Sequence, residues 1–192
     1  NTKASFLFNF LFLINIPLAF ASYPPIHHEL TVTIKQSQSV ARFYDIVTIP
    51  KSAIGSITSL LLNKDSEVEL VEVSGRKIPI ENSGDKFLKF NLPKPLEEVL
   101  SGPLKLLCIY TLPLPISDKS VETLFIAGED YFYPQPRTKN KAKHRVTFKI
   151  KVQTPPSLKA ISQGEKIEET LKDGKRTVIW KEEKPQEEIL LI

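Results

Sequence analysis

The histidines of this chain are its first candidates for metal ligands. The sequence contains three histidines. His27 and His28 are adjacent and precede Glu29, but neighbouring residues of a β-strand point to opposite faces, so the two rings do not face one ion. His144 lies far along the chain in a basic stretch, and the H-E-x-x-H pattern that places two histidines on one helix face is absent. The sequence therefore predicts no metal site and no cofactor within this chain.

Nucleophilic and acid–base catalysis have no clear candidates either. Cys108 lies in the apolar run 106–109, where a buried and inert thiol is expected. Neither a G-x-S-x-G motif nor a glycine-rich phosphate loop occurs. The acidic pairs lie in hydrophilic stretches, which is typical of solvated faces: Glu97-Glu98, Glu168-Glu169 and Glu182-Glu183. We therefore expect no catalytic residue in this chain.

One segment, residues 128–136, combines aromatic and acidic side chains between a strand-like run and the basic stretch. A carboxylate on such a loop can pair with an ammonium group, and aromatic rings can line a peptide-binding cleft. This interpretation makes Glu129, Tyr131 and Tyr133 the substrate-facing residues. The alternative is a loop stiffened by proline, whose aromatic side chains cover the edge of a sheet.

The elements that must position this segment show the two-residue period of β-strands. Residues 30–35 and 146–152 alternate between apolar and polar side chains, as expected for strands with one buried face. In a further strand, Phe43 and Val47 are expected on one face and Tyr44 and Ile46 on the other. Strands are also predicted at 41–49, 56–62, 68–73, 87–92, 104–112, 158–162, 177–181 and 188–192, with a helical turn at 96–100. The prediction is an all-β fold of antiparallel sheets, either a sandwich or a curved, saddle-shaped pair.

The N-terminal residues predict export. Lys3 supplies a positive charge, residues 6–20 form an apolar run, and Ala19-Phe20-Ala21 has the small-x-small pattern of a cleavage site. A membrane-spanning helix needs roughly 20 apolar residues, which this interrupted run does not reach. We therefore expect a signal-peptide helix within residues 1–21 and a β domain over 22–192 that begins at Ser22. The mature protein is expected in the periplasm or outside the cell, with no membrane span after cleavage.

Charge and chain ends further limit the interpretation. The net charge of +4 comes from scattered lysines with acidic residues interleaved, so we expect no nucleic-acid partner. The single cysteine excludes an intramolecular disulfide.

The chain starts at Asn1 rather than at methionine, and its last residues, 189–192, are apolar and strand-like. We expect it to be the N-terminal piece of a longer protein.

The order of the segments resembles the N-terminal part of aminopeptidase N-like zinc metallopeptidases, the membrane alanyl aminopeptidase family. The resemblance spans residues 26–192 and is best at 146–156, a strand followed by two prolines, and at the turn 160–164. Other similar segments are 28–34, 47–50, 104–110, 178–180 and Pro185. Members carry a Gln or Glu before an Ala-Arg and a Phe-Pro near the aromatic loop. This chain departs from that motif at 127–134, where Glu129 stands nearest to the expected position.

The resemblance implies a saddle-shaped, non-catalytic β domain that shapes or caps a peptide cleft. Its partner is the thermolysin-like catalytic domain of the same polypeptide, expected beyond Ile192. Zinc, its H-E-x-x-H helix and the G-x-M-E-N loop would all belong to that domain, and a peptide would be the substrate. Two other hypotheses are open: a stand-alone exported β-sandwich that binds a polymer or a protein, and an inactive member of the same family.

Overall fold

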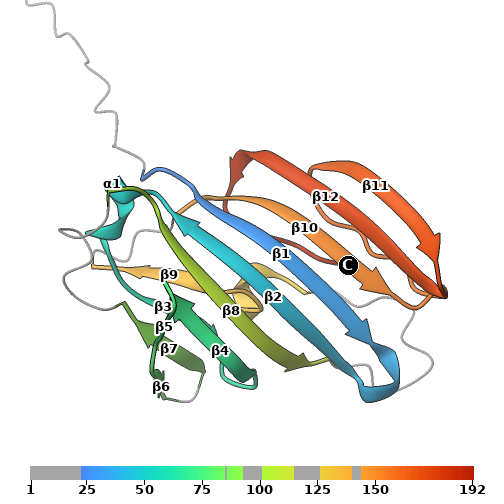
Figure 1. The fold of residues 1–192 in the computed structure, drawn as a ribbon, viewed down its shortest axis with the longest axis horizontal. Helices are drawn as coiled ribbons and strands as arrows, with labels where there is room; N and C mark the ends of the chain where they lie inside the picture. Colours follow the sequence, from blue (N-terminus) through green and yellow to red (C-terminus); the bar gives the residue numbers. More distant parts are fainter. Residues whose placement is uncertain (1–22, 85, 93–100, 115–125, 140–143) are drawn as a thin grey trace, which may run out of the picture.

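A computed structural model describes residues 23–84, 86–92, 101–114, 126–139 and 144–192 (Figure 1). The predicted signal helix and the helical turn predicted at 96–100 lie outside these ranges. Within the described ranges, no helix has the length and apolar character required to cross a membrane.

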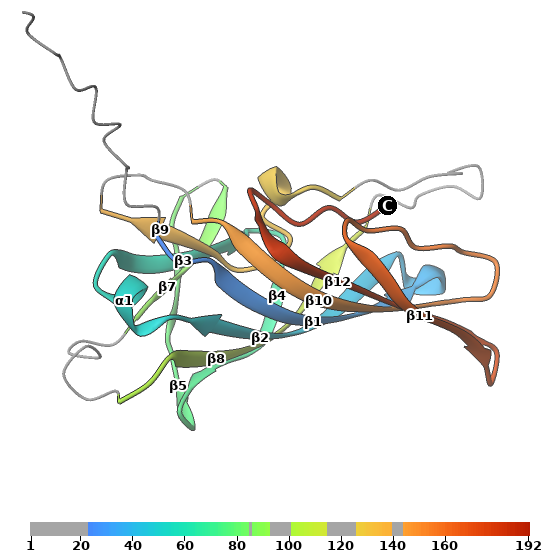
Figure 2. The ribbon, with the colours of Figure 1, turned by 90° about the horizontal axis from the view of Figure 1, so that it is seen from above.

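The larger of two sheets has eight strands in the order β11-β12-β10-β1-β2-β8-β4-β5. In chain order, its strands are β1 (Ile26–Lys35), β2 (Val40–Ile49), β4 (Glu67–Val73), β5 (Arg76–Lys77), β8 (Leu104–Pro113), β10 (Val146–Thr154), β11 (Glu165–Lys172) and β12 (Lys175–Gln186). Figures 1 and 2 show its long central strands running side by side. The mostly-β prediction is confirmed.

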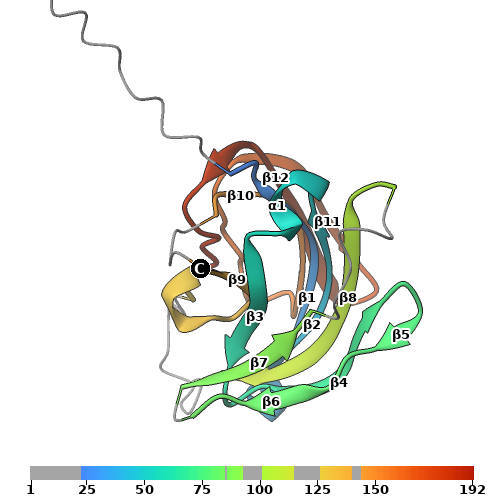
Figure 3. The same cartoon turned by 90° about the vertical axis from the view of Figure 1, so that its left-hand side faces the viewer.

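The smaller sheet has four antiparallel strands in the order β6-β7-β3-β9. They are β3 (Ile57–Asn63), β6 (Ile80–Asn82), β7 (Phe87–Asn91) and β9 (Gln135–Thr138). Figure 3 shows the larger sheet curving around the smaller one, which lies on its inner side. Helical structure among the described residues is limited to α1 (Lys51–Ile54) and the short 3-10 turns Gln36–Gln38 and Gly128–Asp130.

The central pair β1–β10 corrects the expectation of purely antiparallel sheets. These strands run parallel, with Ile26 opposite Val146 and Thr33 opposite Gln153. Alternation along a strand reports which face is buried but not the direction of the neighbouring strand, so the sequence pattern did not reveal this pairing. The larger sheet is therefore mixed.

The core lies between the sheets, and β2 illustrates how the sequence pattern produces it. Phe43 and Val47 are fully buried, whereas Tyr44 is 43% exposed and Ile46 is intermediate, which confirms the predicted faces. Phe43 stacks on Tyr110 of β8, with ring centroids 4.9 Å apart and planes inclined by 4°. An offset aromatic stack of this kind adds about 0.5–1.5 kcal/mol to the free energy of apolar burial.

Two predicted strands near the C-terminus were wrong. Residues 158–162 and 188–192 form no strand. Leu191 forms isolated bridges to Ser162 and to Ile126, and Ile161 and Ile192 exchange backbone hydrogen bonds of 2.7 and 2.9 Å. Conversely, the charged segment between 163 and 176 contains β11, all of whose side chains are exposed. Because no face of β11 is buried, it lacks the alternation by which a strand is predicted.

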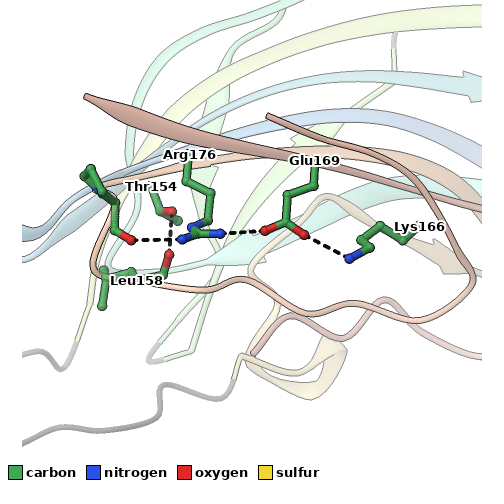
Figure 4. A network of polar contacts seen from close by, with 6 residues as sticks. Thr154, Leu158, Lys166, Glu169 and Arg176 are labelled. Atoms are coloured by element: carbon green, nitrogen blue, oxygen red, sulfur yellow. Dashed lines mark hydrogen bonds and ion pairs between the residues drawn. The ribbon is translucent and has the colours of Figure 1, made fainter. Parts of the chain in front are cut away.

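Polar contacts fasten the β11–β12 hairpin to the loop that follows β10 (Figure 4). Arg176 on β12 donates from Nη1 to Glu169 of β11 at 2.6 Å and from Nη2 to the carbonyl of Pro156 at 3.2 Å. Lys166 donates to the other oxygen of Glu169 at 2.9 Å. These hydrogen bonds hold the pKa of Glu169 below its usual value, the Lys166 bond contributing most.

Candidate functional site

The aromatic segment forms a loop between Ile126 and β9; we call residues 127–134 the aromatic loop. It opens with the 3-10 turn Gly128–Asp130, in which the Asp130 carboxylate accepts a hydrogen bond from the Ala127 N–H at 3.1 Å. Tyr131 follows with φ 54°, in the left-handed region. For a residue with a bulky side chain this conformation costs roughly 1–2 kcal/mol, so other contacts must hold it.

Asn63, at the end of β3, supplies two of these contacts. Its backbone N–H donates to the carbonyl of Tyr131 at 2.9 Å, and its side-chain amide donates to the carbonyl of Asp130 at 2.8 Å. The Tyr131 ring also packs on Phe87 of β7, with centroids 4.4 Å apart. The smaller sheet therefore fixes the outer half of the aromatic loop.

The inner half of the loop is anchored in the core by Phe132 and Tyr133, both almost fully buried. Tyr110 of β8 donates its hydroxyl proton to the carbonyl of Phe132 at 2.8 Å. The Tyr133 hydroxyl accepts a long hydrogen bond, 3.4 Å, from the N–H of Ile189. Burial raises the pKa of Tyr133, so this residue is a neutral phenol at physiological pH.

Beneath the loop lies a buried polar pair that was not predicted from the sequence. His28 of β1 donates from Nδ1 to Oδ2 of Asp45 on β2 at 2.8 Å, and both side chains are fully buried. The ring of His28 meets Tyr133 edge to face, with centroids 5.1 Å apart. The sequence did hold one indication of this pair: Asp45 falls on the face of β2 that is otherwise apolar, and a buried carboxylate requires a partner.

A pocket of about 210 Å³ opens between the aromatic loop, the start of β10 and the segment after β12. Its lining residues are Gly128, Tyr131, Tyr133, Gln135, Pro136, His144, Val146, Glu187 and Glu188. The side chain of Gln135 donates a short hydrogen bond to the carbonyl of Gly128, which joins the two ends of the aromatic loop. We call this space the loop pocket.

Glycine is required at position 128 for the loop pocket to have its present shape. A Cβ at this position would lie 2.6 Å from both Cβ and Oε2 of Glu188, and 3.2 Å from the Tyr133 hydroxyl. A Cβ atom does not approach other atoms as closely as 2.6 Å, so a side chain here would displace Glu188. Gly128 thus allows the Glu188 carboxylate to lie directly against the loop.

His144 forms the back of the loop pocket and is 4% exposed. Its Nε2 lies 3.3 Å from the Ser56 hydroxyl and its ring packs on Tyr23 at 4.6 Å. Burial lowers the pKa of His144, against a smaller opposing effect of a hydrogen bond with the Pro24 backbone. The ring is therefore neutral at physiological pH.

A second depression, of about 420 Å³, lies on the outer face of β10, β12 and β11. Its lining combines Lys151, Lys172 and Lys175 with Glu168 and Asp173. Because charges of both signs are interleaved there, the depression favours no class of ligand.

Solved structures with a similar architecture include M1 zinc metallopeptidases. The M1 zinc metallopeptidase from Deinococcus radiodurans matches with a TM-score of 0.60 and 17% identity, over 88% of this chain and 43% of that one. A mutant of it bound to a Tyr-Ser-Ala substrate matches with a TM-score of 0.60 and 16% identity, over 87% and 42%. The chain has the fold of the N-terminal part of M1 zinc metallopeptidases. Yeast LTA4 hydrolase also matches, with a TM-score of 0.56 and 12% identity, over 86% and 28%.

The chain spans less than half the length of each of these structures. No protein-family model and no curated protein matches it. At these low identities the likeness concerns the fold, and at this level the family resemblance inferred from the sequence is confirmed.

The three residues predicted to face a substrate have different surroundings in the M1-type fold. Tyr131 and Tyr133 both line the loop pocket, Tyr131 partly exposed and Tyr133 buried. Glu129 lies in the 3-10 turn, and its side chain is outside the described part of the structure. Sequence reasoning missed Glu187 and Glu188, which reach the pocket from a distant segment.

The histidines and carboxylates of this chain do not assemble into a zinc site among the described residues. His27 bonds to Thr147 on the outer face of the sheet, whereas His28 is buried with Asp45, so the expected opposite orientation of the two rings is confirmed. Among the described residues no group of three or more His, Cys, Asp and Glu side chains could hold a metal ion. This part of the chain does not fit a zinc site, and no step of zinc chemistry is assigned to it.

Proposed function

We propose that this chain is the non-catalytic β domain of an exported M1-type zinc metallo-aminopeptidase, where it shapes or caps the peptide cleft. The observation that carries the proposal is the fold likeness, which extends over 88% of this chain and only 43% of the M1 zinc metallopeptidase from Deinococcus radiodurans. In this proposal a separate catalytic domain holds the zinc ion and performs hydrolysis, while the β domain presents a wall to the peptide.

The aromatic loop is the part of this wall that we assign to peptide contact. It is anchored from two sides, by Asn63 of the smaller sheet and by Tyr110 of the larger. A loop that is held rigidly and carries exposed polar groups can orient a ligand without a large loss of entropy. The related peptidase bound to a Tyr-Ser-Ala substrate supports a peptide as the ligand class.

The activity is tested on the complete product of the gene that encodes this chain. We expect it to contain an H-E-x-x-H helix beyond residue 192 and to release amino-terminal residues from peptides, with activity abolished by a zinc chelator and restored by zinc. A complete product without that motif and without chelator-sensitive hydrolysis would refute the peptidase assignment.

The cleft-shaping role is tested separately by Tyr131→Ala in the complete protein. We expect KM for a tripeptide to rise several-fold with kcat little changed, because a wall contact contributes to binding in both ground and transition states. Tyr44→Ala is the matched control, since Tyr44 is exposed on the outer face of the larger sheet. Equal effects of the two variants, or an effect on kcat alone, would contradict the role.

Export is tested with residues 1–30 fused to a reporter enzyme that is active only outside the cytoplasm. We expect reporter activity and cleavage after Ala21, and a loss of both when the apolar run is interrupted by Leu13→Arg. Cytoplasmic, uncleaved reporter would refute export.

A further inference from the structure

We propose that the loop pocket binds the basic side chain, lysine or arginine, of a polypeptide ligand. This goes beyond the proposed function, because it assigns a specific site on this chain that requires neither zinc nor a catalytic domain. The argument rests on the charge, the walls and the size of the pocket.

The charge of the loop pocket is negative and is not neutralised by the described residues of its walls. Glu187 and Glu188 both line it, and none of the described lysines or arginines does. Neither carboxylate forms an ion pair with another of the described residues. His144 is neutral, because burial lowers its pKa. A cation is therefore the ligand that the pocket attracts.

The walls add contacts that suit an organic cation rather than a metal ion. Tyr131 contributes a partly exposed ring, and Tyr133 contributes a buried phenol. Ammonium and guanidinium groups are attracted to tyrosine rings as well as to carboxylates. Glu187, Glu188 and His144 all line the pocket, but no three His, Cys, Asp or Glu side chains among the described residues are placed so that they could hold a metal ion.

The geometry of these walls is fixed by the fold. Gly128 leaves room for the Glu188 carboxylate, which any other residue would displace. Asn63 holds Tyr131 in its left-handed conformation through hydrogen bonds of 2.9 and 2.8 Å. A site whose walls are held in place before binding loses less entropy when the ligand arrives.

The size of the loop pocket selects a single side chain. Its volume of about 210 Å³ is below the roughly 300–1,000 Å³ of pockets that hold drug-sized ligands, so it is too small for a folded element. The ligand is therefore one basic residue of a longer chain, with its backbone left outside the pocket.

The test is calorimetric titration of the full chain with acetyl-Ala-Arg-Ala-amide and acetyl-Ala-Lys-Ala-amide, in which only the side chain is charged. The matched neutral probe replaces arginine with citrulline. We expect both basic probes to bind and the citrulline probe to bind at least about tenfold more weakly, as for loss of a charge-assisted hydrogen bond. Glu188→Gln should weaken the basic probes by a similar factor, and Gly128→Ala should also weaken them.

The control variant is Glu67→Gln, which changes an exposed carboxylate on β4 that does not line the pocket. It should leave binding unchanged, and circular dichroism should show all three variants folded. Equal binding of the citrulline probe, equal loss with Glu67→Gln, or no binding of either basic probe would overturn the proposal. Binding of glycinamide in place of the basic probes would also overturn it, since the pocket would then accept a terminal ammonium group. None of these results depends on peptidase activity.

Discussion

The buried pair His28–Asp45 should be among the most sensitive sites for stability in this domain. Both side chains are fully buried and joined by one hydrogen bond of 2.8 Å. The remaining polar atoms, Nε2 of His28 and Oδ1 of Asp45, have no other partner among the described residues. Replacing Asp45 with leucine would leave Nδ1 of the buried His28 ring without its acceptor.

The expected loss is about 1–3 kcal/mol, the usual cost of leaving a buried polar group without its hydrogen-bond partner. Since whole domains are stable by only about 5–15 kcal/mol, this is a large fraction of the total. Replacing both residues, as His28→Leu with Asp45→Leu, should cost much less than the sum of the two single changes, because no polar group is then left unpaired.

Urea denaturation followed by the fluorescence of Trp180, the single tryptophan, measures these free energies of unfolding. Arg42→Ala is the control: it breaks an ion pair with Glu69 whose side chains are 48% and 46% exposed, and should cost no more than about 1 kcal/mol. Single changes that cost less than the Arg42 control, or that add up in the double variant, would refute this account of the pair.

Three further predictions concern buried groups and backbone. Burial raises the pKa of the Cys108 thiol well above its ordinary value, so alkylation at pH 8.5 should follow the unfolding rate; rapid labelling of the native protein would contradict it. Burial lowers the pKa of His144, so the unfolded state binds more protons than the folded state below about pH 6.5. The free energy of unfolding should therefore fall as the pH drops from 7 to 5, and it should fall less in His144→Gln. If the dependence on pH were the same in the variant, His144 would not be its cause. Gly164→Ala should destabilise far more than Gly174→Ala, measured by urea midpoints: both have positive φ, but only the first would force a Cβ into the backbone carbonyl of Lys181. Equal midpoints would refute the steric argument.

Much of the β structure could be predicted because burial imposes a visible alternation. The faces of β2 follow from its sequence, since Phe43 and Val47 must avoid water while Tyr44 and Ile46 need not. What alternation does not encode is the neighbour of a strand, so the parallel pairing of β1 with β10 was missed. β11 was missed because neither of its faces is covered.

The candidate site was predictable in part. Tyr131 and Tyr133 belong to a segment whose composition is unusual, and both line the loop pocket. Glu188 could not be predicted, because its approach to Gly128 depends on two segments far apart in the sequence coming together in the fold. The Asp45 carboxylate, which shares the buried face of β2 with Phe43 and Val47, was a local signal of the polar pair.

The parallel pairing of β1 with β10 also constrains the order in which the domain can fold. β1 receives one neighbour early, through β2, but its other neighbour is 120 positions away, as in the contact of His27 with Thr147. Until residues 146–154 have been synthesised, β1 remains an exposed edge with unpaired backbone groups, which is the kind of edge that seeks other chains. Closing such long-range pairs is slow. We therefore expect this domain to fold late, after its chain is nearly complete, and to depend on protection from aggregation until then.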